Sequence, residues 1–534
     1  MELRVTGSIP VYAAGTLYRT GPGGHTVHTE QGKIWAASHW FDGFTQVHRF
    51  QILPPENAHL SSRVFYNSRS SVDSLVENIR KTGSLQDFTF AQKRDPCQSL
   101  FKKVMAFFMP MPKLLSSKPD GKNIGVTISV NMPGLTPPRA SGNGEGEGHG
   151  SGITTLVNKT DTNAYQFLDP ETLEPVGLAK QADLHPDLKG PLSATHAKSD
   201  PITGDIFNYN LKIGREHVYR VFTVSASTGT TEILATITNA EGAYLHSLLL
   251  TENYVILCVW NSYYALGGMK LFYERSILDA LSEFDPSKLT KWYVVDRKHG
   301  KGVVATYESE PFFCFHTINA WEASSPTDTG KIDIVADLVA YDDSSVLKRF
   351  YYENLKSTSL SARDYVGSKD DSARASIKRF RLPSLPTSPD VETKAKEAVT
   401  AVTVPKFHSG ELPTLNPNFI TKRHRYVYGV TDRGSSTFVD GLVKYDMDTK
   451  TPIFWEQHGH SAGEAIFVPD PAGKHEDDGV LLSVVLDGHA GKSYLLCLDA
   501  RTMEEVGRAA VECVVGFGFH GTHVAENTGR GSQY

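Results

Sequence analysis

The sequence predicts an all-β protein, and a β-propeller is the architecture that it favours. Short runs rich in Val, Ile, Leu, Thr, Tyr and Phe recur along the chain, as in residues 254–260 and 480–486, and such runs are typical of strands. Turn signals such as Asp200-Pro201 and Asp169-Pro170 separate them and suit antiparallel hairpins. A propeller repeats small sheets around an axis and leaves few strand edges exposed. No regular sequence repeat is visible, so this prediction depends on the architecture alone.

The length of 534 residues exceeds what one hydrophobic core usually supports, which indicates either several domains or one large circular architecture. We expect a single propeller domain over residues 1–534. Helical patterns are confined mainly to residues 71–81 and 274–284, and we expect these helices above the strands. Residues 361–405 are polar, charged and interrupted by prolines, a composition that predicts a flexible surface insertion.

The composition excludes several classes of protein. A hydrophobic content of 40%, a charged content of 21% and a formal net charge of −6 describe an ordinary soluble globular protein, and no basic excess suggests nucleic acid as a partner. The five cysteines are scattered and form no C-x-x-C pair, which is the usage of a reducing compartment. Residues 1–7 lack the apolar region of a secretory signal, and no stretch offers the ~18 apolar residues of a membrane span. We therefore expect a cytoplasmic protein.

One segment indicates contact with a membrane surface. The residues from Leu100 to Leu115 mix large apolar side chains with lysines and prolines. This pattern suits insertion into one face of a bilayer, with the apolar groups buried and the lysines facing anionic headgroups. A helix packed on the main body explains the pattern equally well. The first interpretation predicts a cytoplasmic protein with peripheral membrane contact through Leu100–Leu115.

Twenty histidines give ample scope for accidental clusters, so the context of each one has to decide. Four of them stand at the edges of apolar segments, where a propeller strand would point a side chain toward the central axis. These four are His196, His246, His316 and His520. Histidines that are closer in sequence also form pairs, which we expect in loops or at the surface: His25 with His28, and His458 with His460.

The sequence argues against two other kinds of site. Residues 516–521 fit the dinucleotide pattern G-x-G-x-x-G, but only the tail to Tyr534 follows, which is too short for a βαβ unit. No G-x-S-x-G elbow of a serine hydrolase is visible in the sequence. The four histidines therefore remain the candidate site.

Several motifs make the sequence resemble the carotenoid cleavage oxygenase family through nearly its whole length. They are residues 17–23 (LYRTGPG), 39–44 (HWFDGF), 169–173 (DPETL), 315–320 (FHTINA), 475–480 (HEDDGV) and 518–521 (GFHG). The resemblance implies a seven-bladed propeller with a helical and loop cap over an iron site on its axis. It also implies that four blades each contribute one ligand to Fe(2+), and that these ligands are His196, His246, His316 and His520.

The resemblance also implies carboxylates around the metal. Four neutral imidazoles leave the charge of the ferrous ion uncompensated and keep up to two positions open for O2 or water. Metal-bound imidazole commonly donates its remaining N–H to a carboxylate. Glu411 and Glu464 match two of the three acidic residues that the family uses. The third, usually Glu, falls on Asp161, which is one methylene shorter. Direct contact with a histidine, contact through water and a solvated surface charge all stay open for Asp161.

These features predict an oxidoreductase that cleaves a C=C double bond with O2 into two carbonyl products, without an organic cofactor. Residues 71–83 and 88–97 are similar to fungal carotenoid or apocarotenoid oxygenases of the torulene-cleaving kind, so a lipophilic polyene is the expected substrate. Aromatic side chains would line its tunnel and stabilise positive charge on the polyene. Phe44, Phe313 and Phe315 are candidates, although plain core positions explain them as well.

Two alternative functions stay open. Stilbene-cleaving members of the family typically carry a lysine immediately before the third acidic residue. This sequence has Thr160 there, with Lys159 one place earlier and, on a strand, on the opposite face. The stilbene alternative is therefore weakened. A non-catalytic propeller that serves as a protein-binding scaffold is the other alternative, and it would have no need of four axial histidines with carboxylate partners.

Overall fold

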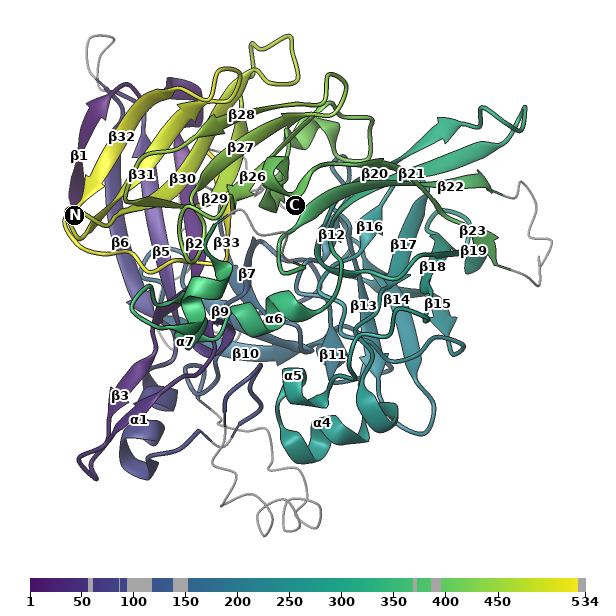
Figure 1. Ribbon diagram of the computed structural model, residues 1–534, viewed down its shortest axis with the longest axis horizontal. Helices are drawn as coiled ribbons and strands as arrows, with labels where there is room; N and C mark the ends of the chain where they lie inside the picture. The colour runs from purple at the N-terminus through teal and green to yellow at the C-terminus, as the bar shows by residue number, and fades with distance from the viewer. Residues whose placement is uncertain are drawn as a thin grey trace.

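Antiparallel sheets make up nearly all of the regular structure and give an all-β propeller (Figure 1). The computed structural model of the protein describes residues 1–55, 61–85, 87–93, 118–137, 152–367, 372–385 and 395–526. Most strands are apolar on both faces. In β17 (Tyr254–Val259) and β30 (Gly479–Asp487), for example, nearly every residue is buried. A strand with two buried faces lies in a sheet that is packed between neighbouring sheets, as the blades of a propeller are.

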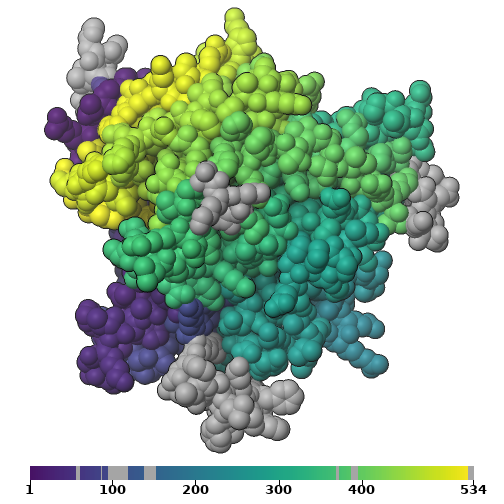
Figure 2. Space-filling view, viewed as in Figure 1, coloured from purple at the N-terminus to yellow at the C-terminus, as the bar shows by residue number. Residues whose placement is uncertain are grey.

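The largest sheet has nine strands. In spatial order they are β29 (His460–Pro469), β30, β31 (Lys492–Asp499), β32 (Glu505–Val511), β1 (Glu2–Gly7), β6 (Arg63–Ser70), β5 (Phe44–Leu53), β2 (Gly15–Gly24) and β33 (His520–Ala525). Strand β1 pairs with both β32 and β6, and β2 pairs with β33. Figures 1 and 2 show this junction, where the purple start of the chain lies against its yellow end. The two ends of the sequence thus share one sheet.

The other sheets follow in chain order. The first contains β7 (Thr127–Val130), β8 (Leu156–Lys159), β9 (Ala164–Leu168) and β10 (Pro175–Lys180). The next contains β11 (Leu192–Ser193), β12 (Lys198–Ser199), β13 (Ile206–Lys212), β14 (Val218–Val224) and β15 (Thr231–Ile237). A third contains β16 (Leu249–Leu250), β17, β18 (Thr290–Asp296), β19 (Val303–Ser309) and β23 (Lys396–Glu397).

Two further four-stranded sheets and a small ribbon complete the described strands. They are β20 (Phe313–Ser324), β21 (Ile332–Tyr341), β22 (Ser376–Leu385) and β24 (Val399–Thr403); β25 (Glu411–Thr414), β26 (Tyr426–Thr431), β27 (Gly441–Asp446) and β28 (Thr451–Trp455); and the ribbon of β3 (Thr26–His28) with β4 (Ile34–Ala36).

The inner edges of these sheets form a closed ring. Strand β16 contacts β20, β20 contacts β25, β25 contacts β29, β29 contacts β33, and β33 contacts β7. The ring closes through Thr127 of β7, whose hydroxyl donates to the carbonyl of Thr195 at 3.0 Å, and through a backbone bridge between His196 and Ser247. Side chains on the inner edges therefore face one axis, although they come from distant parts of the sequence.

Helices are short and few among the described residues. They are α1 (Asp73–Thr82), α3 (Gln181–Leu184), α4 (Met269–Glu274), α5 (Ile277–Ala280), α6 (Ser345–Arg349) and α7 (Tyr352–Leu355), with 3-10 turns η1 (Val11–Ala13), η2 (Trp40–Asp42), η4 (Ala265–Gly268), η5 (Ser361–Tyr365), η6 (Lys406–His408) and η7 (Pro417–Phe419). Among these described helices, none is long and apolar enough to cross a membrane. The predicted membrane segment from Leu100 to Leu115 lies outside the described residues.

The two predicted helices differ in outcome. Helix α1 confirms the first, because Leu75 and Ile79 are buried one turn apart and Gly83 ends the helix in the left-handed region at φ 68°, as is common at helix C-termini. The second is broken. Arg275 adopts φ 51° between α4 and α5, so α5 is a single turn and the pattern of residues 274–284 does not give one helix.

The expectation of a flexible insertion over residues 361–405 is wrong for its described core. Strands β22 and β24 lie in this range and extend the sheet of β20 and β21. The charged residues that suggested a solvated segment pair inside the sheet: Arg379 donates two hydrogen bonds of 2.8 Å to Asp337, whose side chain is fully buried. Residues 368–371 and 386–394 lie outside the description. The single-domain assignment stays a prediction.

Replacing Leu17 by Ala should destabilise the junction between the two ends of the chain. Leu17 lies in β2 between β5 and β33 and has no exposed surface, so truncation should lower the free energy of unfolding by about 2–5 kcal/mol. The shift of the urea midpoint measures the loss. The control, Ile34→Ala, removes an apolar side chain that is 63% exposed and should change stability by less than about 0.5 kcal/mol. Equal midpoints for both variants would contradict this assignment.

Candidate metal centre

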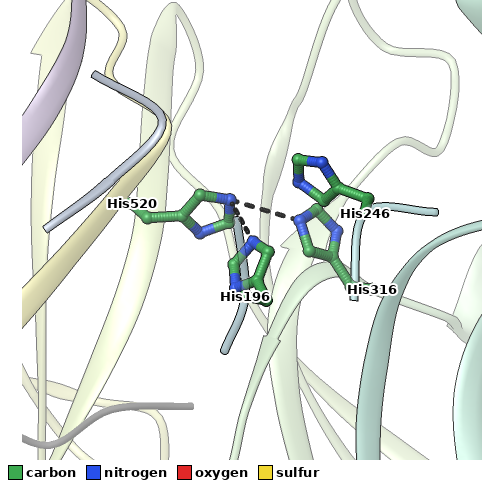
Figure 3. Close-up of side chains that lie close together, drawn as sticks. All are labelled: His196, His246, His316 and His520. Carbon is green, nitrogen blue, oxygen red and sulfur yellow. Dashed lines mark hydrogen bonds between the residues drawn. The ribbon is translucent and has the colours of Figure 1, made fainter. Parts of the chain in front are cut away.

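The four predicted histidines converge on the axis of the ring (Figure 3). His196 lies between β11 and β12, His246 precedes β16, His316 lies in β20, and His520 begins β33. One ring nitrogen of each histidine can be chosen so that all four lie within 4.8 Å of one another. Among the described residues, this is the one group of three or more potential ligands so arranged.

The backbone around the centre fixes the position of the rings. The amide of His196 donates to the carbonyl of His246 at 3.2 Å, which ties two of the segments together. The hydroxyl of Ser247 donates to the carbonyl of Phe315 and accepts from the amide of Thr317, at 2.9 and 3.0 Å. Strand β20 loses regular register on both sides of Thr317, and such bulges re-aim side chains next to functional sites. His316 is thereby turned toward the axis.

Three of the histidines have a carboxylate partner on the nitrogen that faces away from the centre. Nδ1 of His316 lies 2.6 Å from Oε2 of Glu411. Nδ1 of His520 lies 2.7 Å from Oε1 of Glu464. Each carboxylate fixes a tautomer in which Nδ1 carries the proton and Nε2 keeps a lone pair for a metal.

Asp161 fills the third carboxylate position by direct contact. Its carboxylate lies 2.9 Å from Nδ1 of His246, and its side chain is buried. The shorter aspartate reaches its histidine without an intervening water because the segment between β8 and β9 passes close to His246. Of the three arrangements left open by the sequence, the structure therefore has the direct one.

A further polar group holds each of the three carboxylates, and the sequence did not identify these groups. The hydroxyl of Tyr244 donates to Asp161 and that of Tyr341 to Glu411, both at 2.9 Å, and Nη1 of Arg19 donates to Glu464 at 2.8 Å. The sequence contains weak signals for two of these three groups. Tyr244 lies two residues before His246, and Arg19 lies in one of the motifs that carry the family resemblance. Tyr341 comes from β21 and had no signal near any histidine.

Burial sets the protonation of the centre. It lowers the pKa of His196 and of His520 well below the ordinary histidine value, and the neighbouring imidazoles lower it further, so both rings are neutral at pH 7. Burial also raises the pKa of Glu464 to about 7, although Arg19 acts in the opposite direction. For Glu411, burial is opposed by hydrogen bonds from His316, the amide of Leu412 and Tyr341, which hold the pKa of the carboxyl below its usual value.

The donor set fits a divalent cation. With Nδ1 of His316 and His520 committed to carboxylates, their Nε2 atoms carry lone pairs, and these atoms lie only 3.2 Å apart. Nε2 of His196 lies 3.0 Å from the same atom of His520. Lone pairs so close repel unless a positive charge lies among them, and burial disfavours a proton there. Neutral imidazole suits iron, as it does zinc, copper and nickel, so the residues fit iron without selecting it over those metals.

A large apolar cavity adjoins the centre. It measures about 220 Å³ and is lined by His246, His316 and His520 together with ten aromatic side chains. Phe41, Phe90, Phe315 and Phe519 are among these aromatics. Of the three phenylalanines proposed from the sequence, Phe315 lines the cavity. Phe44 packs beside α1 and Phe313 is buried in the main core, so these two are core positions.

The comparison with protein families identifies the family of the chain. The family model described as retinal pigment epithelial membrane protein matches residues 1–525. The chain belongs to this family, the carotenoid oxygenases. Among curated relatives, the carotenoid dioxygenase of Neurospora crassa is 41% identical over 98% of this chain and 88% of its own length. The torulene dioxygenase of Fusarium fujikuroi is 41% identical, covering 98% of this chain and 91% of its own.

Solved structures of carotenoid oxygenases have the same fold as this chain. A cobalt-substituted apocarotenoid oxygenase of Synechocystis matches with a TM-score of 0.72 at 20% identity, covering 98% of this chain and 95% of that one. A variant of that enzyme with glutamate replaced by aspartate matches with a TM-score of 0.71 at 19% identity, with the same coverage. At this identity the likeness establishes the propeller fold alone.

The remaining histidine pairs do not enlarge the metal centre of this carotenoid oxygenase family member. His458 is exposed and stacks on His489, with their ring nitrogens 3.2 Å apart. His460, expected in a loop or at the surface, is instead buried at the start of β29, where Nδ1 contacts the hydroxyl of Tyr494 at 3.0 Å. His25 stacks on Tyr352. The G-x-G-x-x-G pattern of residues 516–521 leads into strand β33, not into a helix.

Glu411→Gln should weaken metal binding by about 10–100-fold, the usual cost of losing an outer partner of a ligating histidine. The neutral amide removes the negative charge that holds the Nδ1 proton of His316 and brings an N–H group against the donor of Tyr341. Titration of the metal-free protein with cobalt(II), followed by its visible absorption, measures the affinity. The matched control is Glu397→Gln, which removes an exposed carboxylate on β23. Unchanged cobalt affinity in Glu411→Gln would refute the role assigned to this residue.

Proposed function

We propose that the chain is a non-haem iron(II) dioxygenase that cleaves a C=C double bond of a carotenoid or apocarotenoid with O2, giving two aldehydes. The observation that carries the proposal is that three of the four converging histidines line an aromatic cavity. Family membership supports it, because relatives at 41% identity are named carotenoid and torulene dioxygenases. A scaffold for other proteins has no use for four buried imidazoles with three carboxylate partners.

The residues of the chain divide the chemistry between them. Iron(II), when bound, supplies the redox chemistry by which O2 reacts with an alkene. Asp161, Glu411 and Glu464 keep the Nδ1 protons of three histidines in place and offset the charge of the metal. The aromatic walls exclude water and hold the polyene beside His246, His316 and His520. Their faces also stabilise positive charge that develops along a conjugated chain.

The residues that line the cavity support a polyene over a phenolic stilbene. Thr160 lines the large cavity, whereas Lys159 lines a separate small cavity on the other side of the centre. Alternation along the chain thus turns the lysine away from the substrate, and no ammonium is available at the position where stilbene-cleaving members present one. Lys122 also lines the large cavity, but it does not stand at the position of the lysine in stilbene-cleaving members, so the polyene stays the favoured substrate.

Two finer features of the fold belong to the same proposal. We propose that the nine-stranded sheet consists of two blades, β29–β32 and β33-β2-β5-β6, which β1 joins edge to edge; with the five other sheets of four or five strands this gives seven blades. We also propose that α1, η2, α5 and the turn between α6 and α7 form the cap, since Leu75, Phe41, Ile277 and Phe350 from these segments line the cavity. Contact with a membrane through Leu100–Leu115 and a cytoplasmic location stay proposals from the sequence.

Incubation of the iron-loaded enzyme with carotenoids, apocarotenals and resveratrol should give aldehydes from the polyenes, identified by mass spectrometry. His316→Ala should abolish turnover and deplete iron, because it removes a ligand and orphans Glu411. The control His458→Ala makes the same change at an exposed position and should keep both activity and iron content. Clean conversion of resveratrol alone would overturn the substrate class, and full activity of His316→Ala would overturn the proposed centre.

Thr160→Lys should lower kcat/KM for a carotenoid by at least about tenfold, because an ammonium group would have to be buried against an apolar substrate. The control Thr228→Lys adds the same charge at an exposed loop position and should leave the rate unchanged. Steady-state kinetics with both variants measures the difference. A Thr160→Lys enzyme with wild-type kinetics would show that this wall of the cavity does not contact the substrate.

A further inference from the structure

The metal centre separates two cavities that differ in chemistry. The large aromatic cavity is lined by His246 and not by His196, and the small one by His196 and not by His246, while His316 and His520 line both. The small cavity measures about 40 Å³, room for a few water-sized groups. Its walls are more polar and include Lys159, Thr127 and Thr195. Nothing in the proposed cleavage reaction uses this second cavity.

His196 is the one histidine of the four without a carboxylate partner among the described residues. Its Nε2 lies 3.0 Å from Nε2 of His520, the side on which the four rings converge. With Nε2 as the metal ligand, neutral imidazole carries its proton on Nδ1, and this N–H needs an acceptor. In the described part of the chain no acceptor lies within hydrogen-bond distance of it. The other three histidines each have a carboxylate in this role.

Lys159 is a buried cation that forms no ion pair with any described residue. Its side chain is 5% exposed, and within the described residues its ammonium makes no hydrogen bond or ion pair. Burial lowers the pKa of Lys159 to about 8, so the side chain is still mostly protonated at pH 7. Glu464 also lines the small cavity, but its carboxylate already accepts from His520, Arg19 and the amide of Gly521.

Two buried ammonium groups lie near the centre, those of Lys198 and Lys159. Lys198 donates to the carbonyl of Thr317 at 3.4 Å, whereas Lys159 has no such acceptor among the described residues. An uncompensated buried charge is costly. A monovalent anion beside Lys159 would offset its charge. The same anion would accept the hydrogen bond that His196 has to donate.

We propose that the small cavity binds a monovalent anion of the size of chloride or formate, held between the ammonium of Lys159 and the imidazole of His196. The anion takes the place of a fourth carboxylate behind the fourth ligand. The site does not depend on which alkene the enzyme cleaves, so it goes beyond the proposed function.

Bromide is the direct probe of the site. Crystals of the metal-loaded wild-type protein, soaked in sodium bromide, should show an anomalous peak in the small cavity within contact distance of Nζ of Lys159 and Nδ1 of His196. Bromide at the molecular surface only, or water refined at full occupancy in the cavity, would overturn the proposal. This measurement needs no variant and no substrate, so a failure to cleave carotenoids would leave its result standing.

Thermal unfolding of the metal-loaded protein provides the second test. At constant ionic strength, chloride and formate should raise Tm by several degrees over gluconate, which is too large for the cavity. Lys159→Met keeps the length of the side chain, removes its charge and should abolish this difference. The control Lys291→Met removes an exposed lysine of β18 and should keep it. An equal anion response in Lys159→Met and the wild type would overturn the proposal, and if Lys159→Met does not fold, the bromide experiment decides.

Discussion

The structure depends on a single electrostatic constraint, the convergence of four uncharged nitrogen lone pairs in a buried space. Each ring has to expose Nε2 to the centre and therefore has to place the Nδ1 proton elsewhere. Asp161, Glu411 and Glu464 accept hydrogen bonds from three of these Nδ1–H groups, with N···O distances of 2.6–2.9 Å. Tyr244, Tyr341 and Arg19 then hold the carboxylates. The specificity of the centre for a cation thus resides in concentric layers of hydrogen bonds, each of which orients the layer inside it.

The propeller is the scaffold that brings such layers of residues together in one chain. The inner edges of its sheets meet around an axis, so residues as far apart as His196 and His520 come within 3.0 Å. Rigid strands with both faces buried limit the movement of the side chains that they carry. The same arrangement separates two environments across the centre. The large cavity is lined mainly by aromatic side chains, and the small cavity has more polar walls. An apolar substrate and a small anion, as proposed above, would therefore bind in separate cavities.

The sequence predicted the centre better than it predicted the layers around it. His316 and His520 stand in motifs that carry the resemblance to the family, and the same resemblance assigns the other two histidines and the three carboxylates. Tyr341 lies on β21, and its contact with Glu411 joins residues 70 positions apart, which no local pattern encodes. Strand β22 was mistaken for a surface segment because Arg379 looks solvated in sequence, whereas it pairs with the buried Asp337. The helix predicted over residues 274–284 is interrupted at Arg275, which has a left-handed backbone conformation. Helix propensity alone does not predict such a conformation at an arginine.

The position of His520 in the last described strand sets an order for the maturation of the protein. During synthesis on the ribosome, the segments that carry the other three histidines emerge first, and the fourth follows about 200 residues after His316. Strand β33 then has to dock against β2, which precedes it by about 500 residues. Acquisition of the full ligand set and closure of the circle are therefore one event. A nascent or truncated polypeptide without β33 has three of the four histidine ligands and binds metal more weakly. The complete site forms only when the ring of sheets has closed.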